Sequence, residues 1–380
     1  MVRTDMATMA KYKVAFVIGK MVGGGLESVI LDALEGIDSN EFQIDLIIDA
    51  DSTYVPYDRI TKLNIRLYEV TPYQQVFGFV RDLDRIFKNQ KYDIVHAHMS
   101  SLNVFPLFAA WMNRVPIRIA HNHNLISPGD GKLKNVLKWL LSKVSTIFPT
   151  DFAAPSIETG SWIYGKRPFE IIPNGVEVEK FRFNQEDRRK VREMLGVGPD
   201  EILIGNFGRF VGVKNQRKYL EIINQLVSAG YSAKGLLVGD GPLKSELKQY
   251  VDSNNVLKNH IIFHDIVEDI EKYYAAIDYF LFTSTREAYG LVSVEAQLSG
   301  AIVVAGPGVP KMTDIGEGIF YYHDDYNAEN WINDIVTSVP LTSDVREIII
   351  EKLNDKSRFD RSTMSENFES YYEKLLLRVR

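Results

Sequence analysis

The sequence contains no cysteine among its 380 residues, which excludes a disulfide framework, a thiolate nucleophile and a cysteine zinc site. It also lacks a run of eighteen apolar residues, so no membrane-spanning helix is expected. The first ten residues, MVRTDMATMA, have no apolar core of the kind found in signal peptides. We therefore interpret residues 1–10 as a leader or an expression remnant outside the fold, and we expect a cytoplasmic protein.

An excess of positive charge is absent as well. The chain has 44 Lys and Arg against 50 Asp and Glu, a formal net charge of −6, which argues against general binding of nucleic acid. Its 45% hydrophobic and 25% charged residues are ordinary for a soluble protein. Because 380 residues are many for a single hydrophobic core, we expect two domains.

Short β-rich segments alternate with longer helical patterns, as in parallel sheets built from βαβ units. One series includes YKVAFVI, DIVHAH and IRIAH, and a second series, with ILIGNFGRF, AKGLLVGDG and YFLFTS, begins after the irregular stretch NGVEVEKFRFNQED. These patterns predict an α/β protein with two Rossmann-like, doubly wound domains and a ligand cleft between them. We place the domains at residues 11–178 and 179–360, and we expect a C-terminal helix at 361–380 to pack back on the first domain.

Two glutamates lie on either side of a glycine in the stretch TSTREAYGLVSVEAQLSG, at Glu287 and Glu295. On one continuous helix they would be about 12 Å apart and would not share a face. Gly290 instead predicts that a helix begins just after it, which leaves Glu287 in the preceding loop. Amides near Gly290, Leu291 and Val292 could then hold a phosphate, while the glutamates accept hydrogen bonds from hydroxyl groups. This arrangement indicates a nucleotide sugar; two solvated acids are the alternative.

A glycine-rich loop, GKMVGGGLES, follows the first predicted strand. Its glycines would let the backbone approach a ligand closely, and Glu27 falls in the first turn of the next helix. The loop is not G-x-G-x-x-G, which disfavours a NAD site. A flexible loop without a ligand is the alternative.

Two further loops follow the first strands of the second series. GRFVGVKN carries Arg209 and Lys214, which could neutralise a diphosphate leaving group without a metal. LVGDGP carries Gly239 and Gly241, which permit a tight turn. Surface cations after a strand are common, so neither loop decides the function alone.

Four of the seven histidines occur in HAH and HNHN, at His96, His98, His121 and His123. Strand alternation directs His121 and His123 to the same side. No H-E-x-x-H motif or carboxylate at helical spacing accompanies them, so we expect no metal site. We expect a hydrogen-bonding role beside a sugar, with a satisfied core histidine as the alternative for His96.

The segment GKLKNVLKWLLSKVSTIF, residues 131–148, is amphipathic, with lysines opposite apolar residues. Such a segment can lie on an anionic membrane surface. A helix that covers a hydrophobic core is the alternative.

Taken together, these motifs resemble the retaining nucleotide-sugar glycosyltransferases of family four, whose GT-B fold has two Rossmann-like domains. They follow the family's order from about residue 12 to 300: the glycine loop with Glu27, DIVHAHMS, RIAHNHN, IIPNGVEVEKF, GRFVGVKN, LVGDGP and the E-x₇-E pair. RIAHNHN and GVPKMTDIG are further similar to the branch that assembles exopolysaccharide and capsule repeat units on lipid carriers.

The resemblance implies that the second domain binds the donor and the first the acceptor. Arg209 and Lys214 would bind the diphosphate, Glu295 the ribose hydroxyls and Glu287 the donor sugar. The active-site histidine would be His121 or His123. The implied donor-binding residues are Gly24, Gly25, Arg209, Lys214, Gly239, Glu287, Tyr289, Gly290, Leu291, Val292 and Glu295, and we assign Glu27 and His98 to the acceptor side.

The resemblance also implies a retaining, metal-independent transfer without a cofactor, from a nucleotide sugar, with UDP as the favoured nucleotide, to a lipid-linked glycan such as an undecaprenyl-diphosphate intermediate. The leaving phosphate would help to deprotonate the acceptor hydroxyl. The protein would be cytoplasmic and peripheral at the inner face of the membrane. The sequence departs from the family at FHD, residues 263–265, and at Ala288. A nucleotide-sugar 2-epimerase of the same fold and a catalytically inactive partner subunit are the alternatives.

Overall fold

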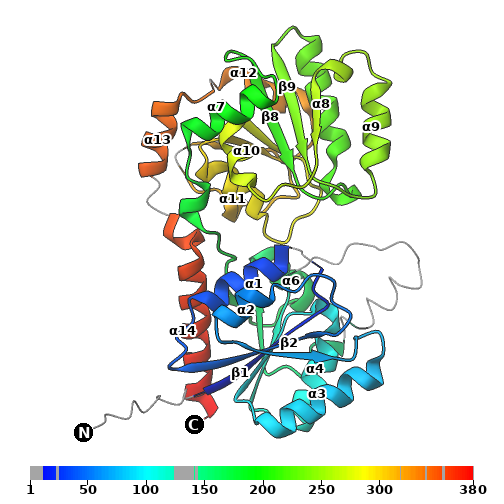
Figure 1. Cartoon of the computed structure of the whole chain (residues 1–380), viewed down its shortest axis with the longest axis vertical. Coiled ribbons are helices and arrows are strands. Elements are labelled where there is room, and N and C mark those ends of the chain that lie inside the picture. The colour runs from blue at the N-terminus through cyan, green and yellow to red at the C-terminus, as the bar shows by residue number, and fades with distance from the viewer. Residues whose placement is uncertain are drawn as a thin grey trace. The chain divides into compact units, whose positions relative to one another are not determined.

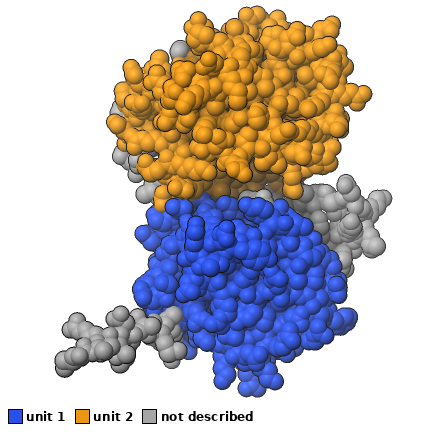
Figure 2. All heavy atoms as spheres, viewed as in Figure 1, with its two compact units in different colours: residues 1–175, 361–380 blue, residues 176–360 orange. Residues whose placement is uncertain are grey.

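The computed structural model describes residues 12–22, 25–123, 141, 144–316, 318–338, 340–352 and 356–379. The chain forms two compact units (Figure 2). Unit 1 consists of Met1–Gly175 together with Arg361–Arg380, and unit 2 consists of Val176–Asp360. The boundary predicted from the sequence lies after residue 178, whereas the two units divide after Gly175.

Unit 1 contains a seven-stranded parallel sheet with strand order β3-β2-β1-β4-β5-β6-β7. Its central strand β1 reads YKVAFVIG, and Val14 to Val17 are fully buried, as expected for a parallel strand that is covered on both faces. The strands are β1 (Tyr12–Gly19), β2 (Phe42–Asp49), β3 (Arg66–Val70), β4 (Ile94–Ala97), β5 (Ile117–His121), β6 (Asp151–Ala154) and β7 (Glu170–Ile171).

Helices lie on both faces of this sheet (Figure 1). They are α1 (Gly25–Glu35), α2 (Tyr57–Lys62), α3 (Val76–Gln90), α4 (Val104–Met112), α6 (Ile157–Tyr164) and α14 (Arg361–Val379), with a 3₁₀ turn η1 (Ser100–Asn103). The C-terminal helix α14, which the sequence analysis expected on the first domain, belongs to unit 1. Its Ser365 hydroxyl donates to the Ala33 carbonyl at 2.7 Å, and its Tyr371 hydroxyl donates to the Phe152 carbonyl at 3.1 Å.

Unit 2 contains a six-stranded parallel sheet with strand order β10-β9-β8-β11-β12-β13. The strands are β8 (Ile202–Phe207), β9 (Ala233–Val238), β10 (Ile261–His264), β11 (Tyr279–Phe282), β12 (Ile302–Ala305) and β13 (Phe320–Tyr322). The helices are α7 (Gln185–Met194), α8 (Gln216–Ser228), α9 (Lys244–Asp252), α10 (Ile270–Ala276), α11 (Leu291–Leu298), α12 (Ala328–Thr337) and α13 (Ser343–Lys352), and short 3₁₀ turns include η2 (Val178–Phe181) and η3 (Gly212–Lys214).

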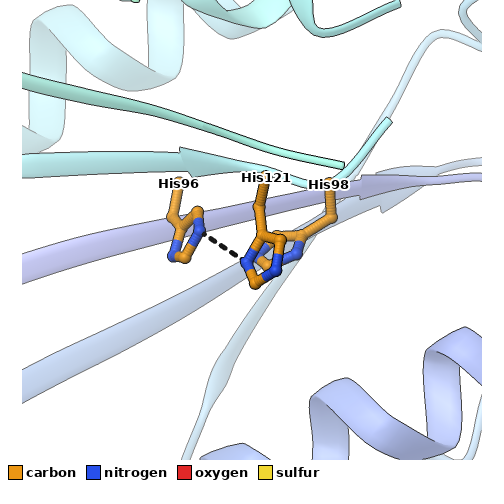
Figure 3. A group of neighbouring side chains, drawn as sticks. All are labelled: His96, His98 and His121. Atoms are coloured by element: carbon orange, nitrogen blue, oxygen red, sulfur yellow. Dashed lines mark hydrogen bonds between the residues drawn. The ribbon is translucent and has the colours of Figure 1, made fainter. Parts of the chain in front are cut away.

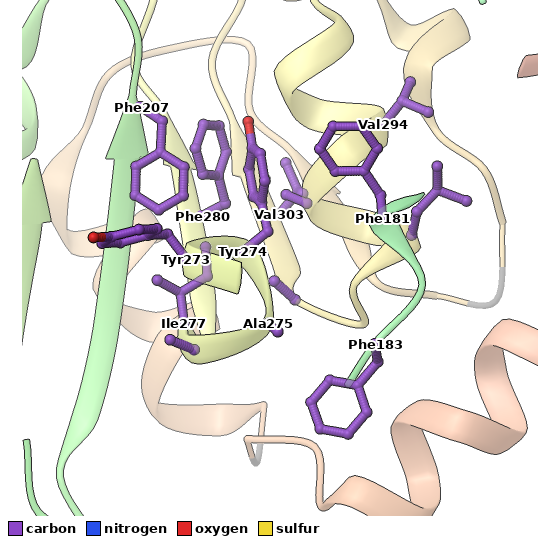
Figure 4. Close-up of a cluster of buried hydrophobic side chains, with 14 of the residues drawn as sticks. Phe181, Phe183, Phe207, Tyr273, Tyr274, Ala275, Ile277, Phe280, Val294 and Val303 are labelled. Atoms are coloured by element: carbon purple, nitrogen blue, oxygen red, sulfur yellow. The ribbon is translucent and has the colours of Figure 1, made fainter. Parts of the chain in front are cut away.

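Alternation along the strands divides the core of unit 2 between the two faces of its sheet. Phe280 and Phe282 pack with α10 and α11 in one cluster (Figure 4), whereas Tyr279 and Leu281 pack with α8 and α12 in the other. Helices therefore cover both faces of the sheet, and the loops at the strand ends are where a ligand can bind. Within the described residues, no helix is long and apolar enough to cross a membrane.

Candidate active site

In unit 2 the strand order reverses between β8 and β11. Ligands of open α/β sheets bind outside the carboxyl ends of the strands at such a switch point. The loops that follow β8 and β11 contact each other here: the Thr285 amide donates to the Val213 carbonyl at 2.8 Å, and the Thr283 hydroxyl donates to the Lys214 carbonyl at 3.1 Å. The GRFVGVKN loop and the loop that carries Glu287 are thus held together by hydrogen bonds to the backbone carbonyls of Val213 and Lys214.

These contacts bring the Lys214 ammonium onto the Glu287 carboxylate, with Nζ 2.7 Å from Oε1. The Lys214 side chain is 23% exposed and the Glu287 side chain 13% exposed, so the pair is partly screened from water but remains accessible. The Glu287 amide donates to the Gly308 carbonyl at 2.8 Å, which holds the loop in place. An ammonium group and a carboxylate therefore lie side by side at the switch point, and their roles toward phosphate and sugar hydroxyl groups stay predictions.

Arg209 is placed differently from Lys214. Its side chain is exposed, and its backbone carbonyl accepts a hydrogen bond from Gln216 Nε2 at 3.2 Å. The Arg209 guanidinium forms no ion pair with a carboxylate of the described residues. The structure therefore brings Lys214 and Glu287 together and leaves the Arg209 side chain free to turn toward an anion; its assignment to the diphosphate stays a prediction.

Helix α11 begins directly after Gly290, which has a φ of 90°, as the glycine in the motif predicted. Glu287 precedes the helix, and Glu295 lies one turn inside it. Glu295 Oε2 accepts a hydrogen bond from the Tyr274 hydroxyl at 2.7 Å, and burial raises the pKa of the Glu295 carboxyl. The two glutamates thus have different surroundings, a lysine for one and a buried tyrosine for the other.

The other residues predicted around α11 lie near its start. Leu291 and Val292 are half-buried in its first turn. Tyr289 is buried, its hydroxyl has no hydrogen-bond partner among the described residues, and burial raises its pKa. Buried hydroxyl groups are usually paired, so the unpaired Tyr289 hydroxyl is an exception within the hydrophobic core of unit 2. The roles predicted for these three residues stay predictions.

Glycine is required at Gly239 and Gly241 by the neighbouring loop. Gly239 has a φ of 146°, and a Cβ atom there would lie 2.1 Å from the Gly208 carbonyl oxygen. A Cβ atom on Gly241 would lie 2.5 Å from the Phe210 carbonyl oxygen. The Phe210 amide also donates to the Asp240 carbonyl at 2.9 Å. These glycines hold the loops after β8 and β9 against each other, and a direct contact of Gly239 with the donor stays a prediction.

In unit 1 the strand order reverses between β1 and β4. Glu27 is buried in the first turn of α1, and its Oε1 accepts a hydrogen bond from the Val22 amide at 2.8 Å. Gly25 begins α1, and Gly24 lies outside the described residues. A pocket of about 480 Å³ adjoins this turn, lined by Met21, Val22, Glu27, Ser28, Leu31, Tyr54, Pro56 and Arg59. Glu27 therefore borders a pocket in the unit that was predicted to bind the acceptor.

The four histidines of HAH and HNHN form one buried cluster in unit 1. Ile119 pairs with His96 across β4 and β5, so the next residues of the same face, His98 and His121, are neighbours. His98 Nδ1 lies 2.8 Å from His123 Nε2, and His121 Nδ1 lies 3.2 Å from His96 Nε2. Figure 3 shows His96, His98 and His121 side by side, with the bond between His96 and His121. The sequence predicted two separate pairs of histidines, but not that all four side chains form one cluster.

Burial makes these imidazoles neutral at pH 7. It lowers the pKa of His123 to about 3 and lowers the pKa of His96, His98 and His121 well below the usual 6.5. Ligand atoms of His96, His98 and His121 lie within 4.8 Å of one another, a set that imidazole-preferring metals accept. Both ring nitrogens of His96 are already hydrogen-bonded, to Tyr372 and to His121, which makes this set a poor match to a metal site.

Most of the amphipathic segment 131–148 lies outside the described residues. Its described end, residues 144–148, adjoins an apolar groove that the sequence analysis missed. The groove has a volume of about 590 Å³ and is lined by Val76, Phe77, Val80, Arg81, Asp84, Val104, Phe105, Phe108, Met112 and Phe148. Phe77 is 94% exposed on its rim. Phe77 lies in the amphipathic helix α3, and the hydrophobic pattern of the sequence alone does not predict that its side chain is exposed.

Two doubly wound parallel sheets, each with polar side chains at its switch point, define the GT-B class of fold. A crystal structure of Anabaena HepE in complex with UDP-glucose has this fold too. It is similar to this chain with a TM-score of 0.79 at 22% sequence identity, covering 96% of this chain and 100% of that chain. At this identity the likeness concerns the fold alone.

Residues 23–180 match the family model described as Glycosyltransferase Family 4, and residues 201–338 match the model described as Glycosyl transferases group 1. The chain therefore belongs to the glycosyltransferases. It is 27% identical over 316 residues to the "Putative glycosyltransferase EpsF" of Bacillus subtilis (strain 168), covering 81% of this chain and 82% of that protein. It is 25% identical over 310 residues to an Escherichia coli UDP-Gal:alpha-D-GlcNAc-diphosphoundecaprenol alpha-1,3-galactosyltransferase, covering 77% of this chain and 79% of that protein.

Proposed function

We propose that this protein is a retaining, metal-independent glycosyltransferase that moves a sugar from a UDP-sugar to a lipid-linked glycan of the exopolysaccharide or capsule type. The observation that carries the proposal is the Lys214–Glu287 pair at the switch point of unit 2. It combines a cation for a diphosphate with a carboxylate for sugar hydroxyls. The complexes of HepE with UDP and with UDP-glucose support a uridine nucleotide as the donor.

In the proposed donor complex, Lys214 and Arg209 bind the diphosphate, and the amides at the start of α11 add hydrogen bonds. Glu287 accepts hydrogen bonds from the donor sugar, and Glu295 accepts them from the ribose. Two cations and a helix start can stabilise the departing diphosphate, so no metal is required.

The anomeric configuration is retained in a same-face displacement. The bond from the sugar C1 to the phosphate oxygen breaks, the bond from C1 to the acceptor oxygen forms, and the acceptor proton passes to the leaving phosphate. Glu287 is held by an ammonium group at 2.7 Å, which makes its carboxylate a weak nucleophile and favours this route over a covalent sugar intermediate. The protein contributes positioning and charge stabilisation.

The acceptor is bound by unit 1 and carries a lipid. The E. coli relative is named for a diphosphoundecaprenol acceptor, and a Streptococcus pneumoniae relative is named as an alpha-monoglucosyldiacylglycerol synthase. The apolar groove beside Phe77 suits a lipid chain or the membrane surface, because moving an exposed phenyl ring out of water lowers the free energy. The protein would thus act on the cytoplasmic side, at the membrane surface.

The proposal is tested first by calorimetric titration of the purified chain with UDP, GDP, ADP and several UDP-sugars, with and without EDTA. We expect micromolar binding of UDP that is unchanged by EDTA. Loss of binding in EDTA would contradict the metal-free donor site, and no binding of any nucleotide would favour the inactive partner subunit.

Transfer is then assayed with an undecaprenyl-diphosphate glycan, and the anomeric configuration of the product is read by NMR. We expect the donor's α or β configuration to be kept in the product, and inversion would contradict the retaining route. A matched reaction without acceptor distinguishes the epimerase alternative, because only a 2-epimerase would convert the UDP-sugar in the absence of a second substrate.

A further inference from the structure

A chain of two hydrogen bonds links the C-terminal helix α14 to His121 within unit 1. The Tyr372 hydroxyl lies 2.7 Å from His96 Nδ1. His96 Nε2 in turn lies 3.2 Å from His121 Nδ1. All three side chains are fully buried, so their polar groups depend on one another for hydrogen bonds. The far nitrogen of His121, Nε2, has no hydrogen-bond partner among the described residues.

The burial of these groups decides the direction in which the protons point. Burial raises the pKa of Tyr372 well above its usual value of 10, so its hydroxyl keeps its proton. If the hydroxyl donates to His96 Nδ1, then His96 carries its proton on Nε2 and donates to His121 Nδ1. His121 then carries its proton on Nε2, and this N–H is the one group left unpaired.

The opposite direction leaves more groups unpaired. His96 would donate from Nδ1 to the Tyr372 oxygen, and the buried tyrosine hydrogen would have no acceptor among the described residues. His121 would donate from Nδ1, and the lone pair of its Nε2 would also be left without a partner. The first direction leaves one buried polar group unpaired and the second leaves two, and because each unpaired buried group costs free energy, the first direction is favoured.

We propose that Tyr372 is a positioning residue that acts through His96 to hold His121 in the tautomer with its proton on Nε2, so that His121 donates a hydrogen bond to an oxygen of the bound substrate. This inference rests on the proposed function, in which one histidine of the cluster lies at the active site. It selects His121 over His123 for this role, a choice that strand alternation does not make.

The aromatic surroundings of Tyr372 support a positioning role. Its ring packs against Phe42, Phe368 and Phe16, with centroid distances of 5.7, 6.1 and 6.5 Å. The hydroxyl is therefore held at a defined place. His98 and His123 lack a comparable hydrogen bond to a tyrosine. Among the described residues they bond only to each other, and His98 Nε2 and His123 Nδ1 have no partner. The proton between His98 Nδ1 and His123 Nε2 can therefore lie on either ring.

The test compares Tyr372→Phe with Tyr371→Phe in the full chain. Tyr372→Phe removes the hydroxyl and keeps the ring. Tyr371→Phe is the matched control, because the Tyr371 hydroxyl lies on the same helix and donates to the Phe152 carbonyl. Proteins labelled with ¹⁵N only at histidine are examined by two-bond ¹H–¹⁵N spectra, which distinguish protonated from unprotonated ring nitrogens. The seven histidines are assigned from single substitutions.

We expect His121 to be protonated on Nε2 in the wild-type protein and in Tyr371→Phe, and to shift toward the Nδ1-protonated form in Tyr372→Phe. Protonation of Nδ1 in the wild type, or identical spectra in both variants, would overturn the inference. Both variants should retain the wild-type melting temperature within a few degrees, which separates a tautomer change from unfolding.

Activity provides the second measurement. In Tyr372→Phe we expect kcat to fall about tenfold, the size of one lost hydrogen bond to substrate, while UDP affinity stays unchanged. An altered tautomer with unchanged kcat would overturn the positioning role. If the wild-type protein transfers no sugar to any acceptor, the proposed function fails, while the NMR result still reports the tautomer independently.

Discussion

Lys214 and Glu287 are 73 positions apart in the sequence, yet Lys214 Nζ lies 2.7 Å from Glu287 Oε1. The pair joins the loop after β8 to the loop after β11, the two strands between which the sheet order reverses. The Lys214 ammonium also lies 5.8 Å from the centre of the Phe282 ring, which limits its freedom. The positions of both groups are therefore set by contacts within unit 2.

Lys214→Ala should weaken the binding of UDP about 10- to 100-fold, because a charge-assisted hydrogen bond to phosphate contributes about 1.5–3 kcal/mol. Calorimetric titration with UDP measures the change. Lys218→Ala is the matched control, since Lys218 is the next lysine along the chain and pairs with Glu221 instead. Equal UDP affinity in wild type and Lys214→Ala would remove Lys214 from the diphosphate contacts.

Glu287→Ala should lower the rate of transfer by a factor of about 100 to 1000, the usual effect of removing one preorganised electrostatic contact. The fold should persist, because Glu287 lies on a loop and its side chain is partly exposed. Transfer assays with circular dichroism as a check on folding measure both. The control is Glu221→Ala, an acid on the exposed part of α8; transfer by Glu287→Ala at the wild-type rate would contradict the site.

Gly239→Ala should destabilise unit 2 by about 2–4 kcal/mol, through the unfavourable φ and the clash with the Gly208 carbonyl. Urea unfolding measures the loss. Gly212→Ala serves as the control, because a Cβ atom there would have no neighbour within 4 Å. If both variants unfold at the same urea concentration, the close approach of the two loops is not a constraint on the fold.

Stability should fall as the pH is lowered below about 6.5, because burial lowers the pKa of the clustered histidines, to about 3 for His123. The unfolded chain takes up protons first, so this contribution is complete above pH 6.5 and is lost between pH 6.5 and 3, at about 1.4 kcal/mol per pH unit per histidine. His123→Gln should show a shallower decline between pH 6 and 5 in urea titrations. A slope equal to that of the wild type would show that His123 titrates alike in both states.

Phe77→Ser should weaken binding to anionic lipid vesicles about tenfold, since burying a phenylalanine side chain contributes about 1.5–3 kcal/mol. Vesicle co-sedimentation measures the effect. Ile157→Ser is the control: Ile157 is 60% exposed on α6 of the same unit but does not line the apolar groove. Equal losses in both variants would indicate nonspecific adhesion and not a lipid-binding groove.

Local patterns in the sequence determined the elements and several of their details. The alternation of β-rich and helical segments predicted two parallel sheets, since this pattern depends only on residues that are near in sequence. Gly290 predicted the start of α11, because a backbone with positive φ favours glycine wherever it occurs. The order of the loop motifs indicated a glycosyltransferase, and the family models confirm this.

Contacts between loops and strands were decided only by the tertiary structure. The ion pair of Lys214 with Glu287 depends on the strand order that sets β8 beside β11, and the union of the four histidines depends on the register of β4 and β5. Tyr372 reaches His96 from a helix 276 positions away, and Phe77 is exposed although its helix is amphipathic. The spacing of residues along the chain predicts helices and strands. The contacts above form only when apolar surfaces that are distant in sequence pack together, and no short sequence pattern predicts that packing.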